Sequence, residues 1–327
     1  MTETQPASTV VQAALDAAVR APSPHNTQPW RFELGDDRID VLLDRDRVLT
    51  VADPEAREAR LACGAAIFNL RTALAVAGRC SEVCLLPDRL RPDHLATVRL
   101  TWRHRPGRRE QELARAIRYR RSNRRPFTDR PVPAWVRQSL REAAHAEGAE
   151  LVLLEHPGDL DALAALLRHA EHAQSEDPRF QAELRRWTNN GEPRDDGVPL
   201  AAGGPRPEQG SLLTPRQYDT NAPARPYETE VLVGVLCSST DTTLVQLRAG
   251  QAMQRVLLTG TTAGVSASFL AQPVELPSTR AALHRLLGER LQPQAVLRFG
   301  YGFTAPATRR RPAETVTCAP EGTEGTP

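Results

Sequence analysis

The segment of residues 21–32, APSPHNTQPWRF, holds the side chains of this 327-residue chain that are best suited to bind a small molecule. Three prolines stiffen its backbone, and among them lie Ser23, His25, Asn26 and Gln28. Short neutral side chains of this kind donate and accept hydrogen bonds, so they suit a planar heterocycle that carries carbonyls and ring nitrogens. The alternative is an ordinary helix-to-strand loop rich in turn-forming residues.

A second segment, residues 120–127, reads RRSNRRPF and places four arginines beside a serine and an asparagine. Neighbouring guanidinium groups repel each other unless solvent or an anion relieves them, and the guanidinium fork matches the oxygens of a phosphate. This pattern favours a phosphate site, with a solvated basic face as the alternative. A third basic group follows the last expected strand, where Arg309 and Arg311 would face the same side of an extended chain. An exposed tail is the alternative for that group.

The composition narrows the chemistry further, because the chain has no lysine and all 42 basic residues are arginine. A Schiff-base lysine, a pyridoxal-phosphate lysine and a Walker A lysine are therefore excluded. The net charge of +2 argues against a nucleic-acid partner or a polybasic membrane contact. Any bound anion must be held by arginine, histidine, hydroxyl, amide or backbone N–H groups.

The cysteines and the N-terminal segment bear on the cellular compartment. Five cysteines, at positions 63, 80, 84, 237 and 318, form no CxxC pair, and the histidine spacing predicts no metal site. The acidic, polar first residues lack the apolar core of a signal peptide, and no apolar run reaches the length of a membrane span. We therefore expect free thiols and a cytoplasmic location.

Hydrophobic periodicity, caps and turn residues predict the elements that must position these segments. In the first part we expect a helix near 9–21, a hairpin at 30–34 and 39–43, a long helix over 53–77, and strands near 82–86 and 95–102. In the second part we expect helices at 113–119, 134–145, within 159–187, 241–263 and 278–288, and strands at 150–154, 231–236, 265–272 and 294–299, with a frayed polar tail after 312. Between them, residues 188–226 contain 12 glycines and prolines in 39 positions and are expected to be irregular.

The two long helices resemble each other at a constant offset of 186 residues. Residues 61–87 and 247–273 share six identities in 27 positions, among them Gly64 with Gly250 and the glycine that ends each helix. A weaker echo relates residues 15–20 to 113–118. We interpret the chain as two copies of one α+β unit that form a pseudo-dimer, so that functional sites lie where the halves meet. A chance likeness between amphipathic helices is the alternative.

The two chemical segments resemble the motifs of a known family. APSxxNxQPWxF is similar to one motif of the flavin-dependent nitroreductase superfamily, and RRSxR to the other. Their order along the chain resembles the Acg-like branch, in which two nitroreductase units are fused and an insertion covers the flavin. The resemblance spans about residues 10–312. It implies an α+β nitroreductase-like fold with long central helices and flanking antiparallel sheets, divided into halves 1–106 and 107–327, with a lid-like insertion at 188–226.

The resemblance also implies the cofactor, flavin mononucleotide (FMN), and the residues that hold it. Each half supplies one motif, so one complete site per chain is expected. The implied contacts are Pro22, Ser23, Asn26, Gln28, Arg120, Arg121, Ser122, Arg124, Ala271, Gln272, Arg309 and Arg311. Among these, the arginines would hold the phosphate and the ring edge, and backbone N–H groups near residue 271 would reach the flavin N5.

The implied activity is transfer of a hydride from NAD(P)H to the flavin, followed by reduction of a nitroaromatic, quinone or related small-molecule acceptor. Such chemistry needs orientation and water exclusion more than side-chain catalysis, so no catalytic residue is assigned, although His25 is a candidate acid or base. A non-catalytic FMN-storing protein and a flavin-dependent oxidase or desaturase are the alternatives. The insertion would distinguish catalysis from FMN storage, because it either opens to admit a substrate or blocks the face of the flavin. It carries Arg194, Arg206, Arg216, Tyr218 and Arg225, which could close over the site. The chain could be a monomer or form a further homodimer.

Overall fold

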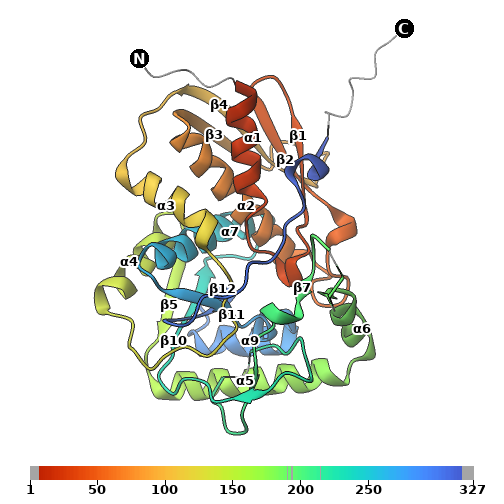
Figure 1. Cartoon of the computed structure of the whole chain (residues 1–327), viewed down its shortest axis with the longest axis vertical. Coiled ribbons are helices and arrows are strands. Elements are labelled where there is room, and N and C mark those ends of the chain that lie inside the picture. Colours follow the sequence, from red (N-terminus) through yellow and green to blue (C-terminus); the bar gives the residue numbers. More distant parts are fainter. Residues whose placement is uncertain (1–6, 190, 193, 214, 319–327) are drawn as a thin grey trace.

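The structure is a computed structural model that describes residues 7–189, 191–192, 194–213 and 215–318. Two long helices, α2 (Arg57–Val76) and α7 (Thr243–Thr262), cross in the middle of the molecule. Figure 1 places the elements of the first part above this crossing and most of those of the second part below it. Helices and antiparallel sheets are mixed within each part, so the expected α+β class is confirmed.

The first part contains two helices and four strands. They are α1 (Ala7–Ala18), β1 (Trp30–Leu34), β2 (Arg38–Leu43), α2, β3 (Arg79–Leu85) and β4 (His94–Arg103). The expected hairpin forms around Gly35, whose N–H donates to the carbonyl of Arg38 at 3.0 Å. The long helix begins at Arg57 rather than at Asp53, because Ala56 takes a left-handed conformation and the Asp53 carboxylate accepts two N–H groups of the first helical turn.

The second part contains most of the remaining elements. Its helices are α3 (Arg108–Tyr119), α4 (Ala134–His145), α5 (Pro157–Glu176), α6 (Pro178–Arg186), α7, α8 (Gln272–Glu275) and α9 (Pro277–Leu286). Its main strands are β5 (Glu150–Leu154), β10 (Leu232–Ser238), β11 (Ser266–Phe269) and β12 (Gln292–Gly300). The described residues of the insertion form a 3₁₀ turn at Leu200–Ala202 and four two-residue strands, namely β6 (Thr188–Asn189), β7 (Val198–Pro199), β8 (Arg206–Pro207) and β9 (Ala224–Arg225).

The two large sheets have the same strand order. Apart from the short edge strand β13 (Thr317–Cys318), one sheet reads β1-β2-β4-β3 and the other β5-β10-β12-β11, and neighbouring strands in these two sets of four are antiparallel. In each sheet a long central helix follows the second strand, and a helix that precedes the first strand packs on that central helix. By this criterion α4 corresponds to α1, so the weaker echo between residues 15–20 and 113–118 does not mark equivalent helices. The shared order is what a duplicated unit would produce.

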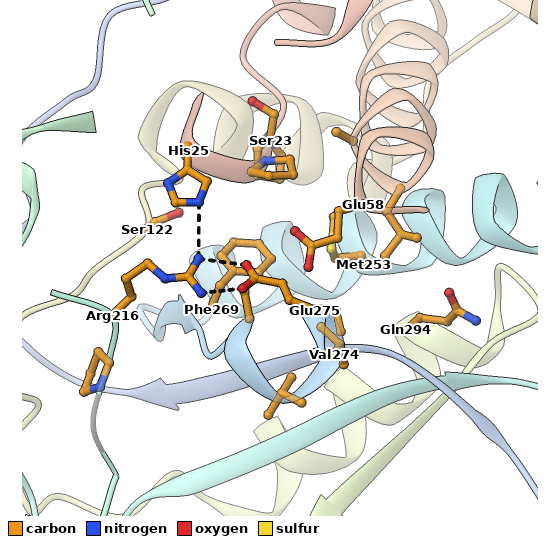
Figure 2. Close-up of a pocket in the computed structure, with 18 of the residues that line it drawn as sticks. Ser23, His25, Glu58, Ser122, Arg216, Met253, Phe269, Val274, Glu275 and Gln294 are labelled. Carbon is orange, nitrogen blue, oxygen red and sulfur yellow. Dashed lines mark hydrogen bonds and ion pairs between the residues drawn. The ribbon is translucent and has the colours of Figure 1, made fainter. Parts of the chain in front are cut away.

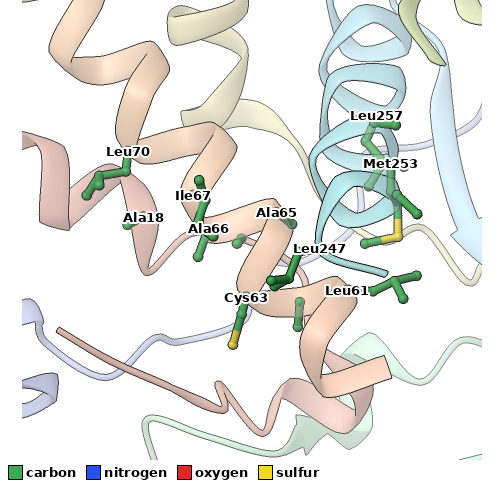
Figure 3. Packing of buried hydrophobic residues seen from close by; sticks show 14 of the residues in the cluster. Ala18, Leu61, Cys63, Ala65, Ala66, Ile67, Leu70, Leu247, Met253 and Leu257 are labelled. Atoms are coloured by element: carbon green, nitrogen blue, oxygen red, sulfur yellow. The ribbon is translucent and has the colours of Figure 1, made fainter. Parts of the chain in front are cut away.

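The crossing of α2 and α7 depends on two glycines that contact each other reciprocally. A Cβ atom on Gly64 would lie 2.3 Å from the carbonyl oxygen of Leu247, and one on Gly250 would lie 2.1 Å from that of Leu61. Both pairs are related by the 186-residue offset found in the sequence. Figure 3 shows Leu61, Leu247 and Met253 packed around this crossing. Only glycine allows the two backbones to approach so closely.

The C-terminal segment returns to the first part of the molecule. Strand β13 (Thr317–Cys318) pairs in parallel with β1, with Phe32 opposite Thr317, beyond a 3₁₀ turn at Ala313–Val316. The expectation of a frayed tail is therefore wrong for residues 313–318. The physical reason is that the side chains of Ala313 and Val316 are 2% exposed and join the main core. Residues 319–327 lie outside the described residues.

Within the part of the chain that the structure describes, one helix is long and apolar enough to cross a membrane by length and composition. This helix is α2, and most of it is buried against α1, α3 and α7. Its apolar character is thus explained by its place in the core of the fold.

Candidate functional site

A cavity lies where the two parts of the molecule meet. Its walls come from the loop after α1, the N-terminal half of α2, the middle of α7, the β11–α8 segment, strand β12 and the insertion, as Figure 2 shows. Of the residues expected from the sequence, those that line the cavity are Pro22, Ser23, Ser122, Arg124 and Ala271.

The loop after α1 is held in an unusual backbone conformation. His25, Asn26 and Gln28 have φ values of 45°, 57° and 54°, in the left-handed region that side chains other than glycine rarely adopt. Each such residue costs on the order of 1 kcal/mol, so the surroundings must hold the loop in place. One such contact is local, because the Ser23 hydroxyl accepts the backbone N–H of Gln28 at 2.9 Å.

The amides of Asn26 and Gln28 fasten this loop to distant segments instead of lining the cavity. The Asn26 amide donates to the carbonyl oxygens of Gly197 at 3.0 Å and Arg309 at 3.1 Å. The Gln28 amide donates to the carbonyl of Asp195 at 2.8 Å and accepts the N–H of Arg311 at 2.8 Å. Both residues therefore tie the loop to the insertion and to the C-terminal segment.

The arginine-serine segment is aligned by strand β11. Ser122 forms an isolated bridge with Ala267, and the N–H of Asn123 donates to the carbonyl of Ala267 at 2.8 Å. This pairing brings Ser122 and Arg124 to the cavity wall. The Arg124 guanidinium also lies 4.8 Å from the centre of the Tyr218 ring, so it connects the segment to the insertion.

Arginines gather beside the cavity at the start of the loop after α1. Arg120 donates to the carbonyl of Arg20 at 3.3 Å, and Arg310 donates to the carbonyl of Ala21 at 3.4 Å. Burial, reinforced by neighbouring arginines, lowers the pKa of Arg120 to about 10 and that of Arg310 to about 9. We call Arg20, Arg120, Arg121 and Arg310 the arginine cluster.

The arginine cluster has no carboxylate partner among the described residues. The Nε atoms of Arg120 and Arg310 are also buried and make no hydrogen bond within the described part of the chain. Like charges held together in this way are relieved by an anion with several oxygens. The cluster therefore has the chemistry of a phosphate site.

The C-terminal arginines are placed differently from the expectation. The Arg309 side chain is 65% exposed and lies 3.7 Å from Asp195, and Arg311 lies 3.7 Å from Asp44. The residue that joins Arg120 is Arg310, which stands between them. The alternation along an extended chain predicts which residues share a side, but it does not predict which side faces the cavity.

The two residues expected from the sequence in the segment after β11 make different contacts. Ala271 lines the cavity, together with Phe269. The Gln272 side chain is buried and its amide donates to Glu171 of α5 at 3.1 Å, so it faces away. A ligand in the cavity could therefore contact the backbone of this segment but not the Gln272 side chain.

The insertion closes one side of the cavity with an arginine that is held from several elements. Arg216 makes a bidentate ion pair with Glu275 of α8, with one contact at 2.7 Å, and donates to Gln174 of α5 at 2.9 Å. It also contacts Nε2 of His25 at 3.2 Å. Burial opposes the charge of Arg216, but the attraction of Glu275 raises its pKa overall.

These contacts keep His25 neutral. Burial, then the charges of Arg216 and Arg124, lowers the pKa of His25 well below its usual value. Its Nε2 accepts from Arg216, and its ring lies edge-on to Tyr218 with the centres 5.7 Å apart. His25 is therefore a fixed part of the wall and poorly suited to carry protons. The other insertion residues considered from the sequence, Arg194, Arg206 and Arg225, do not line the cavity.

Glu58 is among the cavity residues that were not anticipated from the sequence. Glu58, in the first turn of α2, lines the cavity, and its carboxyl makes no hydrogen bond or ion pair within the described part of the chain. Burial raises its pKa well above the usual value, and the charges of Glu275 and Asp53 raise it further, against smaller opposite effects of Arg216 and Arg57. The signal in the sequence was its spacing of three residues from the apolar Leu61, which places both on one helix face.

Relatives of known name cover almost the entire chain. Two proteins of Mycobacterium tuberculosis are each 32% identical to it, and both carry the provisional name NAD(P)H nitroreductase. Acg aligns over 324 residues, which is 97% of both chains, and Rv3131 over 326 residues, which is 97% of this chain and 93% of its own. No family model matches the chain.

Solved structures with a similar course of the chain include nitroreductases described with bound FMN. One from Bacteroides fragilis is 15% identical and covers 66% of this chain and 98% of its own, with a TM-score of 0.38. One from Desulfovibrio desulfuricans is 18% identical, with the same coverage and a TM-score of 0.37. The identity to Acg and Rv3131 over nearly the full length, together with the α+β fold and the two motif segments at one cavity, shows that the chain belongs to the nitroreductase family of these two proteins.

Proposed function

We propose that this protein is an FMN-dependent oxidoreductase that takes electrons from NAD(P)H and passes them to a small-molecule acceptor such as a quinone or a nitroaromatic. The names of Acg and Rv3131 support the donor and the reaction class. The observation that carries the cofactor assignment is the arginine cluster, four arginines without a carboxylate partner in the described ranges, beside the cavity.

The residues present fit FMN from one end to the other. Arg120 and Arg310 offer guanidinium groups, with buried and unused Nε donors, to its phosphate. Ser122 and Arg124 lie on the cavity wall, where a hydroxyl and a cation suit the ribityl chain and an electron-rich ring edge. The bound flavin would supply hydride acceptance and donation. The chain itself would orient the ring, hold its phosphate and exclude water.

The same proposal includes one site per chain at the junction of the halves 1–106 and 107–327. The shared strand order and the reciprocal glycine contacts support an internal pseudo-dimer. The position equivalent to the loop after α1 is the turn after α4, where the buried carboxylate of Glu147 pairs with Arg71 at 2.9 Å and Arg255 at 2.8 Å. This turn carries none of the flavin-loop side chains, so we expect a single FMN.

We also place the protein in the cytoplasm, as a monomer or a further homodimer.

A second candidate function, storage of FMN without turnover, is favoured by one feature of the insertion. Pro215, Arg216 and Tyr218 form part of the cavity wall, and Arg216 is anchored by a buried ion pair. A wall fixed in this way would keep nicotinamide from the flavin. The two candidates share the cofactor and differ only in whether NAD(P)H reduces it.

The cofactor assignment is tested by titrating the purified chain with FMN and following its fluorescence. Charge-assisted hydrogen bonds are worth about 1.5–3 kcal/mol, so Arg310→Ala should weaken FMN binding roughly 10- to 100-fold. Arg309→Ala is the matched control, because the side chain of the neighbouring Arg309 is exposed and lies near Asp195. It should change the Kd by less than about 3-fold. Equal effects of both variants, or a wild-type chain that does not bind FMN, would contradict the assignment.

A further inference from the structure

We infer that Glu58 delivers the proton that accompanies electron transfer to the acceptor in this cavity. The inference rests on the proposed function, because it concerns the reduction step of that reaction. Glu58 lies in the first turn of α2, and Figure 2 shows its carboxyl group pointing toward the pair formed by Arg216 and Glu275. The nearby side chains of Leu61 and Met253 are apolar and also line the cavity.

The charged groups that face Glu58 are engaged by other partners. From the insertion, Arg216 is occupied by Glu275 of α8. From the start of α2 itself, Arg57 is held by Asp241 at 2.9 Å, and Asp53 accepts two backbone N–H groups. Glu58 thus forms no ion pair in the described ranges, and the two arginines whose charges act on it are each paired with another carboxylate.

These surroundings favour the protonated form of Glu58. Burial, Glu275 and Asp53 together raise its pKa well above the usual value. A carboxyl group whose pKa is raised inside a cavity keeps its proton to a higher pH than a free carboxyl group, which suits it to act as a general acid. The other ionisable groups are less suited, because His25 is held neutral by burial and by Arg216, and Glu275 is committed to Arg216.

The reaction needs such a proton. Conversion of a quinone to a hydroquinone consumes two electrons and two hydrogens. A bound flavin would supply one hydrogen together with both electrons, as a hydride, so the second hydrogen must come from elsewhere as a proton on the remaining oxygen. In the proposed step the O–H bond of Glu58 breaks, a new O–H bond forms on the acceptor, and the Glu58 carboxylate regains a proton from solvent before the next turnover.

The first test measures the protonation of Glu58 directly, without FMN or turnover. Infrared difference spectra between neutral and alkaline pH should contain the carbonyl band of a protonated carboxyl group in the wild-type chain. This band should be missing in Glu58→Gln and unchanged in Glu55→Gln, a control whose exposed carboxyl lies one turn away and pairs only weakly with Arg280. A wild-type spectrum without a band that depends on Glu58 would overturn the inference.

The second test separates proton delivery from binding in the FMN-loaded protein. Removal of a general acid lowers rates by about 10²- to 10⁴-fold, so Glu58→Gln should lower kcat for quinone reduction roughly 100-fold. FMN affinity and the rate of flavin reduction by NADPH should change by less than about 3-fold, and Glu58→Asp should restore part of kcat. Wild-type kcat in Glu58→Gln would overturn this inference alone. Absence of FMN binding or of flavin reduction in the wild-type chain would instead overturn the proposed function as well.

Discussion

The crossing of α2 and α7 predicts that alanine at Gly250 destabilises the protein strongly. The new Cβ atom would lie 2.1 Å from the carbonyl oxygen of Leu61 and 2.9 Å from the Cα atom of Gly64. Both are backbone atoms, so no side-chain rotation relieves the clash and the helices must move apart by about 1 Å at their closest point. Overpacking of this kind costs about 1–3 kcal/mol, and a backbone clash belongs at the upper end of that range.

Gly260→Ala in the same helix is the matched control. Its Cβ atom would have ordinary contacts, the nearest being the carbonyl oxygen of Val265 at 3.5 Å. Alanine is favoured over glycine in a helix by about 1 kcal/mol, and this gain is common to both variants. We therefore expect the free energy of unfolding of Gly250→Ala to be about 3 kcal/mol below that of Gly260→Ala.

Thermal and urea unfolding of the two variants and the wild type measure this difference. Each kcal/mol shifts Tm by about 2–4 °C in proteins of 150–250 residues, so the gap between the variants should be several degrees. Adding Gly64→Ala to Gly250→Ala should cost less than the sum of the single effects, because one separation of the helices relieves both clashes. Equal stability of Gly250→Ala and Gly260→Ala would refute the crossing.

Two further predictions concern ion pairs at either end of the cavity. Burial alone would raise the pKa of Asp241, but hydrogen bonds, first of all from Arg57, lower it overall. The ion pair with Arg57 therefore stabilises the folded protein at pH values above the pKa that Asp241 has in the unfolded chain. This stabilisation is lost as the pH falls through the lower pKa that Asp241 has in the folded protein. Asp241→Asn should lower the free energy of unfolding in urea by about 3 kcal/mol near neutral pH, because it leaves Arg57 buried without its partner. The difference in free energy of unfolding between this variant and the wild type should shrink below about pH 4. A difference that stays constant with pH would show that the ion pair is not its cause. Arg216→Ala should leave Glu275 buried without its cation and release the insertion, so that the rate of amide hydrogen exchange in residues 200–213 rises at least about 10-fold. Arg225→Ala, which changes an exposed residue of the same insertion, should not alter this rate. Equal exchange rates in the two variants would show that the ion pair does not hold the insertion.

Local signals predicted much of the fold. Helix α4 and strands β1 and β5 were predicted with the bounds that they have in the structure, because turn residues and prolines mark their ends. The start of α2 was predicted four residues early, since Asp53 does cap the helix but does so from outside it. Parallel pairing of the C-terminal strand with β1 could not be predicted, because it joins residues 285 positions apart through a two-residue contact.

The candidate site was predicted in its parts rather than in its contacts. The segments that carry Ser23, Ser122 and Arg124 do meet at one cavity, as their resemblance to two motifs implied. The sequence could not indicate that the amides of Asn26 and Gln28 would be used to anchor the insertion, because their acceptors are backbone carbonyls that any residue provides. Which arginine of a run faces the cluster also depends on the path of an irregular segment that leaves no periodic signal.

The central proposal for this protein is that NAD(P)H reduces a flavin held in this cavity. The direct measurement is anaerobic mixing of the FMN-loaded chain with NADPH and with NADH, while the absorbance of the oxidised flavin is followed. We expect rapid bleaching by at least one of them, with one flavin reduced per chain. A bound flavin that dithionite reduces but neither nicotinamide bleaches would contradict the claim and would favour storage of FMN behind the wall that contains Arg216.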